Sequence, residues 1–109
     1  MAARPAMEKA VQDLRMLSVT GGARLGSFNA TWPLARLTAD AKTLRLSVLG
    51  APLKFTRESV LELSAMRGFF SHGLQIKHAE SAYPKRIIFW CFKLDALTAG
   101  LRRLGWLVN

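Results

Sequence analysis

Two histidines and a single cysteine in this chain of 109 residues could form a metal site or a Cys–His pair. His72 and His78 are six residues apart, and Cys91 lies further along the chain. A metal site usually takes three or four ligands at a recognisable spacing, and a nucleophile needs a base and an orienting group. Neither pattern is present, so we expect His78 to be a core histidine bonded to backbone and Cys91 to be a small buried hydrophobe.

Carboxylates and glycine motifs offer no stronger signal for catalysis. Glu58 and Glu62 could be neighbours on a strand, but acid–base catalysis also needs a pocket and a perturbed pKa. The sequence has no phosphate-binding glycine loop and no nucleophile-elbow motif. We therefore expect a non-catalytic binding domain rather than an enzyme, with no catalytic residue, no metal and no cofactor.

The charge of the chain narrows the class of partner. Sixteen Lys and Arg residues against seven Asp and Glu give a formal net charge of +9. Such an excess favours an acidic protein, an anionic membrane or a nucleic acid. The basic residues are scattered from Arg4 to Arg103, which also fits a charge that serves only solubility, and both interpretations stay open.

The elements that would position these side chains follow from the hydrophobic period. Leu44, Leu46 and Val48 alternate with polar residues, as in a half-buried strand. The short polar turn Asp40-Ala41-Lys42 joins this run to an earlier alternating one, which predicts a β-hairpin. The pattern predicts strands over residues 34–39, 44–49, 53–55, 59–66, 74–78 and 87–92, the last covered on both faces.

Helical spacing returns at both ends of the chain. Leu94, Leu97, Leu101 and Leu104 form one apolar stripe, and we expect a helix over residues 95–105, with Asp95 as its N-cap and Gly105 just beyond its last turn. Near the N-terminus, the apolar face is made by Met7, Val11, Leu14 and Leu17.

The predicted organisation is a short extension followed by one domain. Residues 1–20 form an amphipathic or flexible extension, which the Gly21-Gly22 pair would end, and residues 21–109 form the domain. Several short antiparallel strands followed by one helix predict a mainly β fold. We expect a bent barrel or strongly curved antiparallel sheets capped by the helix, because closing a sheet removes exposed edges.

Three segments of the chain resemble small bacterial proteins of the pleckstrin-homology-like (PH-like) type. They are Gly26–Leu37, Gly73–His78 and Tyr83–Trp90, and the resemblance covers residues 24–108. It implies a seven-stranded bent barrel with a C-terminal helix.

Better-known members of this group bind phosphoinositides through basic residues on the first hairpin. The matching region offers Arg36, Lys42 and Arg45 as a candidate basic hairpin. Their spacing departs from the family pattern, so the resemblance does not carry the phosphoinositide site over to this chain.

Loop aromatics and apolar ends supply the remaining candidate contacts. The loop aromatics and their basic neighbours would stack on nucleic acid, contact membrane or simply cap the barrel mouth. Trp32 is expected to pack in the core rather than to bind a ligand. The candidate ligand or membrane contacts are Phe69, Phe70, Tyr83, Lys85, Arg86 and Arg67, and the candidate self-association residues are Leu14, Leu17 and Trp106.

Among partners, we expect a protein or a second copy of the chain first, an anionic membrane second and a nucleic acid third. The apolar runs are shorter than the ~20 residues of a membrane span, and the first residues do not read as a secretory signal. A single cysteine cannot form an internal disulfide. We therefore expect a cytoplasmic protein.

Overall fold

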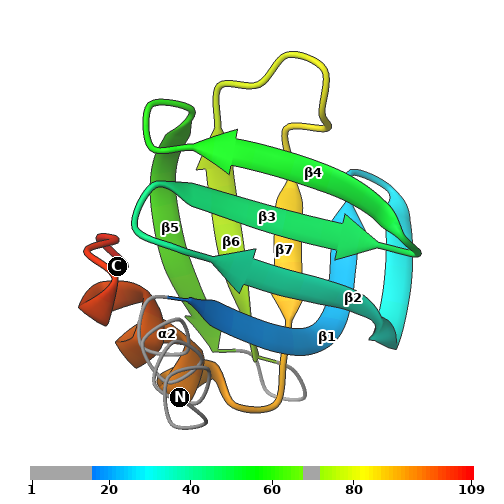
Figure 1. The fold of residues 1–109 in the computed structure, drawn as a ribbon. Helices are drawn as coiled ribbons and strands as arrows, with labels where there is room; N and C mark the ends of the chain where they lie inside the picture. The colour runs from blue at the N-terminus through cyan, green and yellow to red at the C-terminus, as the bar shows by residue number, and fades with distance from the viewer. Residues whose placement is uncertain (1–15, 68–71) are drawn as a thin grey trace, which may run out of the picture.

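The computed structural model describes residues 16–67 and 72–109. Seven strands and one helix follow one another along this part of the chain (Figure 1). The strands are β1 (Leu17–Leu25), β2 (Phe28–Ala39), β3 (Thr43–Val48), β4 (Ala51–Thr56), β5 (Val60–Arg67), β6 (His72–His78) and β7 (Ile87–Trp90), and the helix is α2 (Leu94–Arg103).

All seven strands belong to one sheet with the order β4-β3-β2-β1-β7-β6-β5, and every neighbouring pair is antiparallel. The sheet curls so that β2 to β4 lie across from β5 to β7, and α2 covers one end of the curl (Figure 1). The strand β1 joins the two halves, because it pairs with both β2 and β7. The predicted fold class, mainly β with a curved antiparallel sheet and a C-terminal helix, is confirmed.

The core lies inside the curl and follows the two-residue period of the strands. Leu44, Leu46 and Val48 of β3 are buried, whereas Arg45 between them is exposed. Successive side chains of a strand point to opposite faces, so one face meets the core and the other meets solvent. The apolar stripe of α2, which was predicted from the sequence, closes the open end of the core. Three of its side chains are at most 2% exposed: Leu94, Leu97 and Leu101.

The ends of α2 differ in part from the prediction. The helix begins at Leu94, and its N-cap is Lys93, which makes no side-chain cap. Asp95 therefore lies in the first turn and not at the cap, and it pairs instead with Arg67 of β5. Gly105 has a φ of 95° just beyond the last turn, as expected of a glycine in that position.

The strand β1 corrects the prediction for the N-terminal extension. Residues 17–20 are strand and pair with β2 from Leu17↔Ala39 onward, so the helical face predicted through Leu17 is wrong there. Leu17 instead packs on Gly100 of α2. Gly21 also belongs to this strand. A side chain at this position would run into the Trp90 carbonyl oxygen, which explains why the residue is glycine. The rest of the predicted extension lies outside the described residues.

Both edge strands of the sheet have backbone partners outside the sheet. On β4, Pro52 has no N–H, and the Lys54 N–H donates to the Tyr83 hydroxyl at 3.1 Å. On β5, the Ala65 N–H donates to the Asn109 carbonyl at 2.8 Å. Such contacts at the edges limit pairing with another chain.

Arg57 and Trp106 connect the C-terminal turn to the loops on the open side of the barrel, between the edge strands β4 and β5. The Trp106 indole Nε1–H donates to the Asp40 carbonyl at 2.7 Å. The Arg57 guanidinium lies 4.7 Å from the centre of the indole and donates to the carbonyl oxygens of Leu104 and Gly105. The C-terminal turn is therefore tied to the β2–β3 and β4–β5 turns. Within the described ranges, no helix is long and apolar enough to cross a membrane.

Candidate functional site

The strand β2 carries a four-residue bulge at the corner of the sheet. Ala30 pairs with Ala23 and Ala35 pairs with Gly21, so residues 31–34 lie opposite Gly22 alone. All four are exposed, and the Trp32–Pro33 peptide bond within the bulge is cis. Bulges re-aim side chains and are frequent beside functional sites. Here the bulge directs Trp32, which is 54% exposed, away from the core. The prediction that Trp32 packs in the core is wrong.

Gly22 allows the backbone of this bulge to pack closely against β1. A Cβ atom at this position would lie 2.6 Å from the Ala30 carbonyl oxygen and 3.1 Å from the Trp32 nitrogen. The backbone of the bulge therefore occupies the space that a side chain would need. Only glycine permits this approach, because ordinary Cβ contacts are longer than these distances.

Trp90 of β7 lies beside Gly22 and has a glycine on each neighbouring strand. It pairs with Gly22 of β1 and with Gly73 of β6. A Cβ atom at Gly73 would lie 2.8 Å from Cε3 of the Trp90 indole, so the ring leans over this glycine. The two glycines give the Trp90 indole room on the outer face, where it is half-buried.

The residues around Gly22 line a hollow of about 460 Å³. Phe92 stands at its rim, 79% exposed, with its ring centre 5.9 Å from that of Trp32 and tilted by 59°. Tilted rings at this distance make a favourable aromatic pair. We call this site the aromatic hollow; its lining residues are Gly22, Arg24, Ser27, Asn29, Ala30, Thr31, Trp32 and Trp90.

A cation and an amide supply the polar groups of the aromatic hollow. Arg24 pairs with Asn29 across β1 and β2, so both side chains lie on the same face of the sheet. The Arg24 Nε–H donates to the Gly26 carbonyl at 3.1 Å, which orients the guanidinium. Among the residues that the structure describes, no carboxylate lines the hollow. It therefore combines two tryptophans with one positive charge.

Two leucines extend the exposed apolar surface from the bulge to the β3–β4 turn. The Leu49 N–H donates to the Leu34 carbonyl at 2.9 Å, and the two side chains are 58% and 46% exposed. Leu49 and Gly50 form a tight turn in which both have a positive φ, 52° and 83°. This conformation is uncommon for a bulky residue. Trp32, Leu34, Leu49 and Phe92 together are called the apolar corner.

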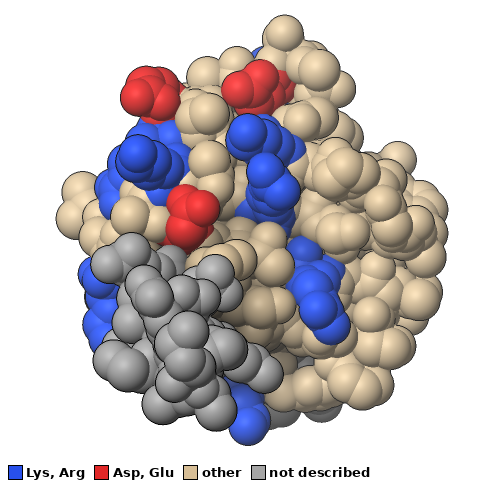
Figure 2. Space-filling model, in the orientation of Figure 1, with Lys and Arg blue, Asp and Glu red and all other residues tan. Residues whose placement is uncertain are grey.

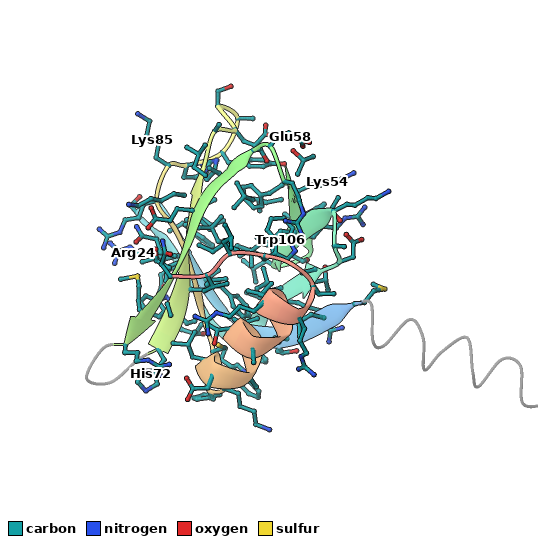
Figure 3. All side chains as sticks on the ribbon, turned by 90° about the vertical axis from the view of Figure 1, so that its left-hand side faces the viewer. Arg24, Lys54, Glu58, His72, Lys85 and Trp106 are labelled. Carbon is teal, nitrogen blue, oxygen red and sulfur yellow. The ribbon has the colours of Figure 1, made fainter. Side chains whose placement is uncertain are left out.

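A row of basic residues crosses the outer face of β2, β3 and β4. Arg45 lies directly opposite Lys54, and Arg36 lies one strand away on the same face. Like charges directly opposite one another destabilise a sheet slightly. Figure 2 shows basic side chains down the middle of this face and an uncharged area at its right-hand end. Figure 3 shows Lys54 of the basic row and Arg24 of the hollow on opposite sides of the barrel.

The candidate basic hairpin of the sequence is placed partly on this row. Arg36 and Arg45 belong to the row, and Lys42 lies in the β2–β3 turn. Asp40 organises that turn, because its carboxylate accepts the Lys42 and Thr43 N–H groups, each at 2.7 Å. These bonds hold the pKa of the Asp40 carboxyl below its usual value.

The predicted ligand or membrane contacts are not brought together among the described residues. Arg67 ends β5 next to Asp95, whereas Lys85 and Arg86 lie in the loop beyond the far end of β6. Figure 3 shows His72 and Lys85 at opposite ends of the molecule. Tyr83 is half-buried and packs edge-on against Phe55. The remaining two candidates, Phe69 and Phe70, lie outside the described residues.

His78 bonds to backbone through both ring nitrogens, as predicted, although it is half-buried rather than in the core. Its Nε2 lies 2.7 Å from the Pro84 carbonyl, and its Nδ1 accepts the Glu80 N–H at 3.0 Å. In this pair of bonds Nδ1 accepts, and Nε2 lies where it can donate to the carbonyl. Cys91 is buried, and burial raises the pKa of its thiol. Over residues 16–67 and 72–109, His, Cys, Asp and Glu form no group that could hold a metal ion.

Of the residues predicted for self-association, Trp106 is unsuited to that role as the structure stands. It is only 4% exposed, beneath Arg57. Leu17 is half-buried against α2, and Leu14 lies outside the described residues. Among the described residues, the exposed aromatics are instead Phe28, Trp32 and Phe92.

Sequence reasoning missed the aromatic hollow, although part of its signal was present. Gly22 had been interpreted only as the end of a helix. A glycine within a strand marks a bulge or a close approach of another chain segment, which is its role here. A scan against protein-family models and a search of curated proteins found no match for this chain. Its function is therefore inferred from the site itself.

Proposed function

We propose that this chain is a non-catalytic, PH-like binding domain that contacts a protein partner through the apolar corner and the aromatic hollow. The curled sheet of seven antiparallel strands and the single C-terminal helix support the PH-like assignment, since this is the architecture that the resemblance implies. One observation supports the binding role above all: Trp32 and Phe92 stand exposed beside one another at a hollow.

Exposed aromatics of this kind are typical of interaction surfaces. Large apolar patches on a folded domain mark interfaces, and tryptophan is enriched among the residues that dominate binding energy. Such residues act best when a pocket excludes water around them. The aromatic hollow provides a concave site beside the exposed rings of Trp32 and Phe92.

The first test is the size of the protein in an extract of the cells that make it. We expect the wild-type chain to elute from a sizing column well above its own 12.1 kDa, in a complex with the partner. Replacing two residues of the site, Trp32→Ser with Phe92→Ser, should release the monomer, because both side chains are exposed and neither is needed for the core.

A matched pair of substitutions away from the site serves as the control. Glu58 lies in the β4–β5 turn at the end of the barrel opposite His72 (Figure 3), and Arg103 lies in the last turn of α2; both are exposed and neither lines the hollow. Glu58→Ser with Arg103→Ser leaves the net charge unchanged and should leave the complex intact. A wild-type chain that elutes as a monomer would contradict the proposal, and so would a complex that both double variants disrupt to the same extent.

An anionic membrane is the second candidate partner, and the basic row supports it. Arg36, Arg45 and Lys54 lie on one face with no carboxylate paired across the strands, and the same face ends in the exposed side chains of Leu34 and Leu49. Apolar side chains beside cations suit a surface that enters the headgroup region.

Co-sedimentation with vesicles separates the membrane candidate from the protein candidate. Binding to phosphatidylserine vesicles but not to phosphatidylcholine vesicles, reduced by salt and by Arg45→Gln with Lys54→Gln, would support the membrane. Replacing Trp32 would then matter less than replacing the basic row. No sedimentation at low salt would remove this candidate.

A further inference from the structure

We propose that the aromatic hollow binds a large apolar side chain from an acidic segment of the partner, and that Arg24 meets a carboxylate of that segment. This inference rests on the proposed protein-binding function and names the chemistry of the partner.

The shape of the hollow indicates a side chain as its occupant. Its lining includes Gly22 and two tryptophans from different strands, Trp32 and Trp90. A volume of about 460 Å³ is at the lower end of the range for small-molecule sites. A phenylalanine or leucine side chain with part of its backbone fits this space and these apolar surfaces.

The charge at the hollow selects an acidic neighbour for that side chain. Arg24 is the only charged residue among the lining residues, and its guanidinium is oriented by the Gly26 carbonyl. The chain as a whole has a net charge of +9. A positive surface of this kind favours an acidic partner and speeds its association.

The same charge argues against the main alternative ligand for an aromatic site. Clusters of aromatic rings also bind cations such as methylated lysine through their electron-rich faces. A cation in this hollow would lie beside the Arg24 guanidinium, and the part of the chain that the structure describes places no carboxylate in the lining to offset the repulsion. Arg24 therefore distinguishes an acidic ligand from a basic one.

Three tryptophans make this inference measurable by NMR spectroscopy. Trp32 and Trp90 line the hollow, whereas the indole N–H of Trp106 is bonded to the Asp40 carbonyl in the buried C-terminal turn. The indole signal of Trp106 is therefore an internal control. Blocked five-residue peptides DEFDE, QSFSQ and KKFKK, together with DEGDE, separate the effect of charge from that of the apolar side chain.

We expect DEFDE to shift the indole signals of Trp32 and Trp90 and to leave the Trp106 signal in place. DEGDE and KKFKK should shift neither, and QSFSQ should bind more weakly than DEFDE. Arg24→Gln should weaken the binding of DEFDE about two- to fivefold, as for loss of one partly exposed charge pair. Arg103→Gln removes the same charge from the exposed end of α2 and should change the affinity little.

Each contrary result has a distinct meaning. If QSFSQ or KKFKK binds as tightly as DEFDE, or if Arg24→Gln and Arg103→Gln act equally, the acidic partner is refuted while the hollow remains a binding site. If none of the peptides moves the Trp32 and Trp90 signals at about 5 mM, where even millimolar affinity is visible, the inference fails altogether. The elution of the wild-type complex then decides separately whether the protein-binding function survives.

Discussion

The substitution Gly22→Ala tests how the aromatic hollow is built. The added methyl group would lie 2.6 Å from the Ala30 carbonyl oxygen, 3.1 Å from the Trp32 nitrogen and 3.2 Å from the Thr31 carbonyl carbon. All three are backbone atoms of β2, which cannot swing aside as a flexible side chain can. The bulge must therefore shift outward, and Trp32 must move with it.

The expected cost follows from two opposing effects. Forcing an extra methyl group into a packed site costs about 1–3 kcal/mol. Alanine also restricts the unfolded chain, which returns about 0.4–1 kcal/mol. The free energy of unfolding should therefore fall by about 1–2 kcal/mol, which lowers the melting temperature by about 4–8 °C for a domain of this size.

Thermal and urea unfolding measure this change, and the Trp32 indole signal reports whether the bulge moves. Glu58→Ala is the control, since Glu58 is exposed in the β4–β5 turn. We expect that variant to stay within about 0.5 kcal/mol of the wild type. If Gly22→Ala is as stable as the wild type and leaves the Trp32 signal unchanged, the close approach of β2 at Gly22 is not a constraint.

Three further outcomes follow from the described contacts. Asp40→Ala should lose about 1–2 kcal/mol at pH 7 by removing the bonds to the Lys42 and Thr43 N–H groups. Because folding lowers the pKa of Asp40, this stabilisation is complete above about pH 4 and disappears as the pH falls through the lower folded pKa. The difference between Asp40→Ala and wild type in urea unfolding should therefore shrink at pH 2, and a constant difference would contradict this account. Trp106→Phe leaves the Asp40 carbonyl without its indole donor and should cost about 1–3 kcal/mol in the same assay; an unchanged unfolding midpoint would show that water replaces the bond. Cys91 is buried with a raised pKa, so it should react with a thiol reagent only on unfolding, and rapid labelling of the native protein would show that β7 opens.

The strand pattern could be predicted where one face of a strand is buried. Leu44, Leu46 and Val48 alternate with outward residues because their side chains meet the core on every second position. The apolar stripe of α2 could be predicted because every third or fourth side chain of a helix lies on the same face. These local periods were sufficient for the fold class and for the β2–β3 hairpin.

The aromatic hollow could not be predicted in the same way, because it depends on register. Four residues of β2 lie opposite Gly22, and this mismatch exists only once β1 and β2 are paired. A tryptophan such as Trp32 is usually a core residue, and no local pattern marks it as exposed. The strand β1 was missed for a related reason: its glycines allow close approach to β7 and β2, but in the sequence they resemble a helix stop.

The role of Trp106 was misjudged because its partners are distant in sequence. Arg57 and Asp40 meet it only when the C-terminal turn closes the barrel. A terminal apolar residue therefore became part of the core, whereas Trp32 and Phe92 are exposed.

Site-specific photo-crosslinking tests the central claim most directly. A benzophenone amino acid at position 92, where the native phenylalanine is 79% exposed, would be activated in the cells that make the protein. The control is the exposed position 58 in the β4–β5 turn, at the end of the barrel opposite His72. We expect a discrete protein adduct from position 92 and none from position 58. Adducts to lipid, equal protein adducts from both positions, or no adduct at all would contradict a protein-binding site at the aromatic hollow.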